Sequence, residues 1–161
     1  EHAQHIHPDD YELFNDERII ASVQPIHCIS DAASITEKRL GERCKYAYPW
    51  KSLYEQGVKL ISGSDFPIES HNPLIGIEAL TRRIPFGSKE SWFPDEILDI
   101  DTAVKTYTDY PNLATETSSS LGKLKADYLA DMVILDKDIY SYPEISKINI
   151  LATFVDGKRV Y

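Results

Sequence analysis

The clearest hydrophobic pattern in the chain is the run VKLI at residues 58–61, which Gly57 and Gly63 bound on either side. A short apolar run between turn residues predicts a strand buried on both faces. The sequence GSDFP follows, so Asp65 lies just beyond the carboxyl end of this strand. In parallel α/β folds that end of the strands carries the chemistry, although a lone aspartate there also serves as a helix cap or stabilises a turn.

Further apolar runs precede this strand. Residues 18–25, RIIASVQP, predict another buried strand, with His27 two residues beyond its final proline. Residues 8–15 predict a helix that begins at a proline followed by acidic residues, and residues 49–57 predict a compact helix between a proline and a glycine. Helices and strands that alternate with short joints predict parallel strands and right-handed crossovers.

The middle of the chain is mostly helical by its spacing. Residues 30–40 are polar and weakly helical, residues 39–49 predict an exposed connection, and residues 84–95 predict a loop. Helices are expected over residues 74–83 and 101–107, with one more helical turn within 110–117 and a joint at Ser118-Ser119-Ser120.

The last part of the chain has a different pattern. Residues 132–135 and 148–155 predict strands, and an Asp-Gly pair predicts a hairpin between the second of these and residues 158–161. We therefore divide the chain into an α/β part, residues 1–117, and a small antiparallel β unit, residues 118–161.

Composition limits the classes of function. With 161 residues the chain can bury one sizeable core, and an apolar fraction of 42% with 10 tyrosines is typical of a globular protein. A net charge of −9 argues against binding to nucleic acid or to an anionic membrane surface. No apolar run has the length of a membrane span, and no signal peptide pattern is visible. Cys28 and Cys44 lack a C-x-x-C spacing, which favours reduced thiols in a cytoplasmic protein over a disulfide.

The candidate chemistry depends on residues that follow the predicted strands. If Glu1-His2, Gln24-Pro25 and Ser64-Asp65 end consecutive parallel strands, then His2, His27 and Asp65 project at one rim of the sheet. Imidazole and carboxylate groups are good ligands for zinc and related divalent ions. A bound ion acidifies a water molecule, and a nearby carboxylate can take its proton, so the pattern predicts metal-assisted hydrolysis.

The other histidines are weaker candidates. We interpret His5 and His7 as structural or surface residues. His71 either lines a pocket or is a loop residue without a functional role. His27 contacts the metal or the substrate, or it is an inert buried histidine.

Several segments in order carry a resemblance to a known family. They are EHAQ at residues 1–4, SVQP at 22–25 with His27, YPWKSL at 48–53 and GSDFP at 63–67, followed in the tail by Gly122-x-Leu124, ADMVIL at 130–135 and VDGK at 155–158. This series resembles the amidohydrolase superfamily, and most closely its family 3, which includes N-substituted formamide deformylases.

The resemblance implies a fold and a function. It implies a (β/α)8 TIM barrel with a metal centre at its C-terminal face, and a composite β-sandwich built from both chain ends. His2 is then the metal-ligating histidine after the sixth strand, and Asp65 is the aspartate after the eighth, a ligand that also shuttles protons. The implied activity is metal-dependent hydrolysis of amide-like, non-peptide carbon–nitrogen bonds in a small molecule that His27 contacts. One or two divalent ions, zinc first among them, would be the cofactor.

This sequence departs from the family pattern in two respects. The H-x-H after the first strand, the Lys or Glu after the fourth and the His after the fifth have no counterpart and would lie before Glu1. Asp127 stands where the family commonly has glycine, which bears on the geometry of that turn.

We therefore expect a C-terminal fragment, inactive and weak in metal binding on its own. Its open strand edges favour a homo-oligomer formed by strand pairing. The alternative function is that of a non-catalytic barrel remnant acting as a binding or scaffold module.

Overall fold

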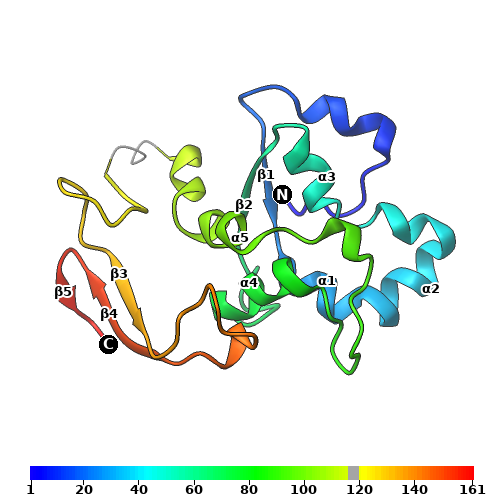
Figure 1. Cartoon of the computed structure of the whole chain (residues 1–161). Helices are drawn as coiled ribbons and strands as arrows, with labels where there is room; N and C mark the ends of the chain where they lie inside the picture. The colour runs from blue at the N-terminus through cyan, green and yellow to red at the C-terminus, as the bar shows by residue number, and fades with distance from the viewer. Residues whose placement is uncertain (116–119) are drawn as a thin grey trace.

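The computed structural model describes residues 1–115 and 120–161, except for the side chain of Ala33. Two parallel strands, β1 (Ile20–Val23) and β2 (Lys59–Ser62), lie among helices, and a separate antiparallel sheet lies toward the C-terminus (Figure 1). The chain therefore has a mixed helix and sheet architecture, in agreement with the α/β class expected from its sequence. The predicted division at residue 118 and most of the predicted serine joint fall outside the described residues.

The parallel pairing of β1 and β2 confirms the crossover inferred from the element order. Ile20 pairs with Lys59 and Val23 with Ser62. The prediction that β2 is buried on both faces is wrong in this chain, because Leu60 is fully buried while Lys59 is exposed. One face of the pair thus packs on the core, and the other is open.

Most of the other regular elements are helical, and each predicted helix is found within a few residues of its expected bounds, except that 116–117 of the last one fall outside the described residues. Residues 32–36 form a π-helical turn, η2 (Ala32–Thr36), between two of the α-helices. The α-helices are α1 (Pro25–Asp31), α2 (Glu37–Leu40), α3 (Trp50–Glu55), α4 (Pro73–Arg82) and α5 (Ile100–Tyr107), and the 3₁₀ segments are η1 (Pro8–Phe14), η3 (Gly41–Tyr46), η4 (Pro94–Glu96), η5 (Tyr110–Ala114) and η6 (Ile145–Lys147).

Side-chain caps explain where several helices begin. The Asn72 side chain accepts a hydrogen bond from the Leu74 amide (3.0 Å) at the start of α4, and Asp99 accepts one from the Thr102 amide (2.9 Å) at the start of α5. At α3 the cap comes from a distant residue, because the Glu96 carboxylate accepts the Lys51 amide at 2.9 Å. Carboxylates at helix N-termini also complement the helix dipole, so these contacts fix both helix starts and loop paths.

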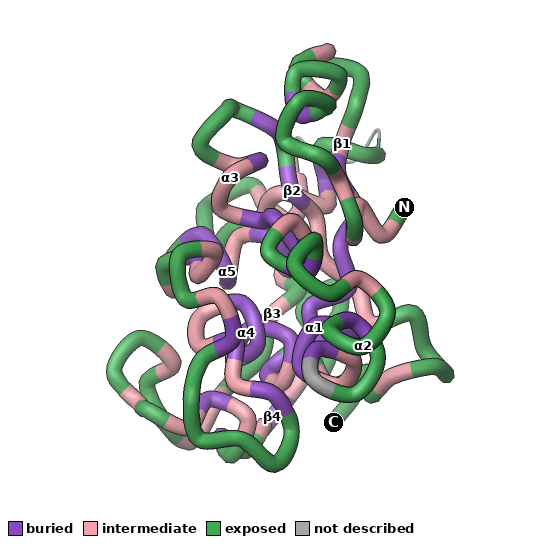
Figure 2. The backbone as a smooth tube through the Cα atoms, turned by 90° about the vertical axis from the view of Figure 1, so that its right-hand side faces the viewer, coloured by how far each residue is buried: buried purple, intermediate pink, exposed green. Residues whose placement is uncertain are grey.

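The buried residues gather around β1, β2, α1 and α4 (Figure 2). Arg83 is fully buried among them, and its guanidinium lies over the rings of Trp50 (4.5 Å to the centroid) and Trp92 (5.5 Å). Its Nε donates to the Trp92 carbonyl and its Nη1 to the Tyr48 carbonyl, both at 2.9 Å. Burial lowers the pKa of the Arg83 guanidinium, with nearby acidic groups opposing the shift. Arg83 therefore joins α4 to the Tyr48 segment and to the loop after α4.

The prediction that residues 39–49 form an exposed connection is wrong for its second half. Cys44, Ala47, Tyr48 and Pro49 are buried. Apolar residues at irregular spacing carry no helical or strand period, so their burial depends on tertiary contacts such as those with Arg83.

The C-terminal strands are β3 (Met132–Leu135), β4 (Ile150–Val155) and β5 (Lys158–Arg159), paired antiparallel in that order. The Asp156-Gly157 hairpin is confirmed, and both residues have the positive φ of a type I′ turn, 50° and 72°. Asp127, at the position where glycine was expected, has φ 70°, which aspartate tolerates better than most residues. The substitution therefore keeps a left-handed turn at that place.

Candidate functional site

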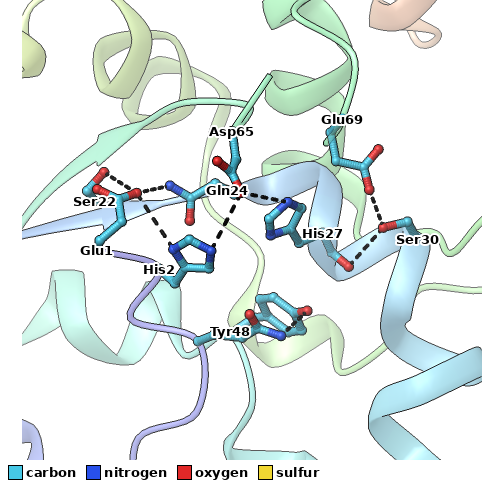
Figure 3. Close-up of polar contacts among 10 residues, drawn as sticks. Glu1, His2, Ser22, Gln24, His27, Ser30, Tyr48, Asp65 and Glu69 are labelled. Atoms are coloured by element: carbon cyan, nitrogen blue, oxygen red, sulfur yellow. Dashed lines mark hydrogen bonds and ion pairs between the residues drawn. The ribbon is translucent and has the colours of Figure 1, made fainter. Parts of the chain in front are cut away.

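The three predicted site residues meet at the carboxyl end of the parallel strands (Figure 3). His2 Nε2 lies 3.8 Å from Asp65 Oδ2, and His27 Nε2 lies 4.0 Å from the same oxygen. The two imidazole rings are tilted by 53° with their centroids 5.5 Å apart. The structure thus brings together two ring nitrogens and one carboxylate oxygen from segments that are far apart in the sequence.

Asp65 reaches the site from the turn after β2. The ladder extends one bond past the strand, with the Gly63 amide donating to the Val23 carbonyl at 3.0 Å, and the chain then turns through a hydrogen bond from the Ile68 amide to the Asp65 carbonyl (2.8 Å). Asp65 has φ 55°, a left-handed backbone that is uncommon for residues other than glycine. Such conformations cluster at functional sites, where the surrounding structure enforces them.

His2 reaches the site by a different route from the one predicted. We expected it at the end of a strand, but among the described residues no strand precedes β1. Instead Tyr48 holds the segment, since its amide donates to the Gln4 carbonyl (2.6 Å) and its hydroxyl accepts the Gln4 side-chain amide (2.6 Å). His5 forms an isolated antiparallel bridge with Ala47. His2 itself has φ 72°, so both rim residues, His2 and Asp65, have left-handed backbones.

His27 lies in the first turn of α1 and is buried. Its Nε2 finds no hydrogen-bond partner in the described part of the chain. A buried ring nitrogen left without a partner costs about 1–3 kcal/mol, so this atom is available to a group that the protein itself does not supply.

Sequence reasoning missed the polar residues that surround these three. Glu1 Oε1 accepts the Ser22 hydroxyl at 3.1 Å and a short hydrogen bond from the Gln24 side-chain amide, and it lies 3.8 Å from His2 Nδ1. Burial opposes ionisation of Glu1, but the hydrogen bonds from Ser22 and Gln24 outweigh it and lower the pKa of the carboxyl. The only feature of the sequence that pointed to these polar residues was the position of Ser22 and Gln24 at the end of a predicted strand.

A second missed contact fixes the loop that carries Asp65. The Ser30 hydroxyl donates to Glu69 Oε1 at 2.6 Å, and it also lies 3.3 Å from the His27 carbonyl. This contact ties α1 to the segment after β2, so the elements that carry His27 and Asp65 are fastened to each other.

The remaining histidines lie outside the site, as expected for His5 and His7. His7 Nδ1 accepts the Asp9 amide (3.3 Å) at the start of η1, and His5 packs against the Tyr48 ring. His71 packs edge-on against Phe66 with centroids 5.3 Å apart. Both cysteines are free thiols, and burial raises the pKa of Cys28 to about 12.

The side chains at this site are of the types that bind a divalent cation, although they are too few to complete a metal site. Two imidazoles and a carboxylate are ligands that zinc and its neighbours accept, and the unpartnered His27 Nε2 faces the same oxygen as His2. Over residues 1–115 and 120–161, however, no three His, Cys, Asp or Glu side chains are set closely enough to form a complete metal site. His2 and Asp65 therefore fit the role of two ligands within a larger set.

Comparison with known proteins extends this result. The whole chain, residues 1–161, matches the sequence profile of the amidohydrolase family. It is 38% identical over 165 residues to the Protein LONG AFTER FAR-RED 3 of Arabidopsis thaliana, covering 100% of this chain and 28% of the relative. It is 30% identical over 117 residues to the N-substituted formamide deformylase of Arthrobacter pascens, covering 71% of this chain and 21% of the relative.

A solved structure agrees with these relatives. The chain resembles an uncharacterized metal-dependent hydrolase from Pyrococcus horikoshii with a TM-score of 0.76 and 28% identity, over 92% of this chain and 30% of that one. The fold and the rim of histidine and aspartate thus place the chain in the class of α/β proteins of amidohydrolase fold. The chain belongs to the amidohydrolase family, and it spans under a third of the length of the curated relatives that it matches.

Proposed function

We propose that the whole protein to which this chain belongs is a metal-dependent hydrolase of amide-like, non-peptide carbon–nitrogen bonds. The observation that carries the proposal is the approach of His2 Nε2 and His27 Nε2 to the same oxygen of Asp65, at 3.8 and 4.0 Å. Membership of the amidohydrolase family and the similarity to a metal-dependent hydrolase support it. The similarity to an N-substituted formamide deformylase favours small amides as substrates.

Each residue has a distinct part in the proposed mechanism. A bound divalent cation, zinc in our proposal, would supply a Lewis acid for the scissile carbonyl and for a water molecule. His2 and Asp65 would hold that cation. Asp65 accepts a proton from the attacking water and returns it to the leaving nitrogen, while His27 donates a hydrogen bond to the substrate.

The wider architecture is also part of the proposal. We propose that this chain supplies the last βα units of a (β/α)8 barrel, and that β3, β4 and β5 belong to a composite β-sandwich. The remaining metal ligands then lie elsewhere in the whole protein, and the 161 residues alone are inactive. This arrangement agrees with a partial donor set and with a match to under a third of each relative.

Partners and location follow from composition rather than from the site. We propose a small-molecule substrate, no nucleic acid or membrane partner, and self-association by pairing of open strand edges. Free, buried thiols at Cys28 and Cys44 favour the cytoplasm. Among the helices described here, none is long and apolar enough to cross a membrane.

The test uses the whole protein loaded with zinc and a small secondary amide, N-butylformamide, with release of butylamine as the readout. We expect turnover in the wild type, and a loss of about 10²–10⁴-fold in Asp65→Asn, the range for removing a general acid–base group. Asp95→Asn is the matched control, because Asp95 is exposed in η4. Near-normal turnover in Asp65→Asn would remove Asp65 from the mechanism. A loaded protein that cleaves no amide would favour the binding or scaffold role instead.

A further inference from the structure

The hydrogen bond between Ser30 and Glu69 lies beside the rim, and the proposed mechanism does not use it. The Ser30 hydroxyl donates to Glu69 Oε1 at 2.6 Å, a length typical of a hydroxyl group that donates to an ionised carboxylate. Both residues are half-buried, so water competes for this bond less than it would on an open surface. Figure 3 shows the two side chains meeting next to His27 and Asp65.

On one side this bond is attached to the helix turn that carries His27. Ser30 follows His27 by three residues in α1, so both side chains lie on the same side of the helix. The Ser30 hydroxyl is also 3.3 Å from the His27 carbonyl, but the shorter contact with Glu69 takes its proton. The place of the Glu69 carboxylate is therefore set relative to the turn of α1 that begins at His27.

On the other side the bond is attached to residues 64–71, the segment between β2 and α4 that contains Asp65. Among the described residues, it is the only hydrogen bond that joins this segment to a distant part of the chain. The other hydrogen bonds are local, such as the one from the Ile68 amide to the Asp65 carbonyl at 2.8 Å. A left-handed backbone such as that of Asp65 persists only where the surrounding structure enforces it. The bond from Ser30 supplies that enforcement at the far end of the turn.

We propose that Ser30 and Glu69 are positioning residues, which hold the Asp65 carboxylate beside His27 for the reaction. No hydrogen bond from the described residues reaches the Asp65 carboxylate itself, so its place depends on the path of its backbone. A displacement of about 1 Å in a reacting group can lower a rate about 10²-fold. The inference rests on the proposed function for the role of Asp65. Neither positioning residue touches the substrate, because both act through the loop and through α1.

The first measurement is the turnover of N-butylformamide by the whole protein at saturating zinc. We expect Ser30→Ala to lower kcat about 10–10²-fold and to change KM by less than about threefold, because the substrate contact His27 stays in α1. Ser30→Thr keeps the hydroxyl and should retain most of kcat. Ser30→Ala combined with Glu69→Ala should be no slower than either variant alone, because each change removes the same hydrogen bond.

The second measurement does not depend on activity. Amide hydrogen exchange over residues 64–71, followed by mass spectrometry on the zinc-free whole protein, reports how often this segment opens. We expect the Ile68 amide to exchange about tenfold faster in Ser30→Ala than in the wild type. If Ser30→Ala does not fold, Glu69→Gln takes its place, since its side-chain oxygen accepts more weakly and should give smaller changes in the same directions.

The matched control is Ser34→Ala. Ser34 is exposed one turn after Ser30, and among the described residues its hydroxyl donates only to the backbone carbonyls of Ser30 and Asp31. This control should leave both measurements unchanged.

Several results would overturn the proposal. They are a wild-type kcat or wild-type exchange in Ser30→Ala, a Ser30→Thr variant as slow as Ser30→Ala, and losses that add in the double variant. If the wild type cleaves no amide, the proposed function fails, and the catalytic role of the Ser30–Glu69 bond fails with it. The exchange measurement still shows in that case whether the bond holds the loop.

Discussion

Replacing the buried Arg83 with methionine should destabilise the chain strongly, although no acidic side chain pairs with its guanidinium among the described residues. Methionine fills a similar apolar volume but leaves the Trp92 carbonyl without a donor, whereas the Tyr48 carbonyl keeps its hydrogen bond from the Trp50 amide (2.9 Å). An unsatisfied buried acceptor costs about 1–3 kcal/mol, and loss of the second hydrogen bond at Tyr48 costs about 0.5–1.5 kcal/mol. Loss of the stacking on Trp50 and Trp92 adds about 1–2 kcal/mol, and relief of the desolvation of a buried charge offsets part of the total. We expect a net loss of about 2–4 kcal/mol in the free energy of unfolding.

Equilibrium unfolding in urea, followed by tryptophan fluorescence, measures this loss directly. The chain has 2 tryptophans, and both contact Arg83, so the signal reports the cluster that is perturbed. Arg39→Met is the matched control, because Arg39 is exposed in α2 and its replacement should change stability by under about 0.5 kcal/mol. A loss of under about 1 kcal/mol in Arg83→Met would refute the view that this guanidinium holds the Tyr48 segment and the loop after α4 together.

Other predictions concern metal binding, a thiol and a turn. Calorimetric titration of the 161-residue chain with zinc should show weak binding, because His2 and Asp65 form only part of a ligand set, and tight one-to-one binding would contradict this. Burial raises the pKa of Cys28 from 9.0 to about 12, so the contribution of this thiol to the free energy of unfolding is present below pH 9 and should fall as the pH rises toward 12. Urea unfolding of a Cys28→Ala variant tests this, because the variant should lack that alkaline fall in stability. Gly122→Ala should destabilise the chain by over about 2 kcal/mol, because Gly122 has φ 81° and an added Cβ would lie 2.4 Å from the Thr108 carbonyl oxygen; an unchanged melting temperature would argue against this packing.

The position of Asp65 could be predicted from the sequence because a single local rule fixes it. An apolar run that ends in a glycine turn places the next polar side chain at the strand end, and the parallel pairing with β1 puts His27 beside it. His2 was expected at the same rim and is found there, but on the wrong grounds. Its segment is held by hydrogen bonds between Gln4 and Tyr48, which lie more than forty residues apart. The pattern of apolar and polar positions gives no sign of such a long-range contact.

The residues missed by the sequence share one physical property. Arg83, Glu1 and Glu96 are charged side chains whose role depends on partners distant along the chain. Charged residues are usually exposed, so a pattern of polar and apolar positions assigns them to the surface. Only the tertiary structure shows that Arg83 is buried and that Glu96 caps a helix. The error over residues 39–49 has a related cause, because the burial of apolar residues such as Tyr48 also depends on tertiary contacts.

The backbones of His2 and Asp65 have a consequence for protein design. Glycine would fit φ values of 72° and 55° with less strain, yet the chain places an imidazole and a carboxylate there. A designer who grafts these side chains onto another scaffold must therefore also transfer the bends that carry them. A scaffold whose loops follow ordinary right-handed or extended paths would aim both groups away from their meeting point.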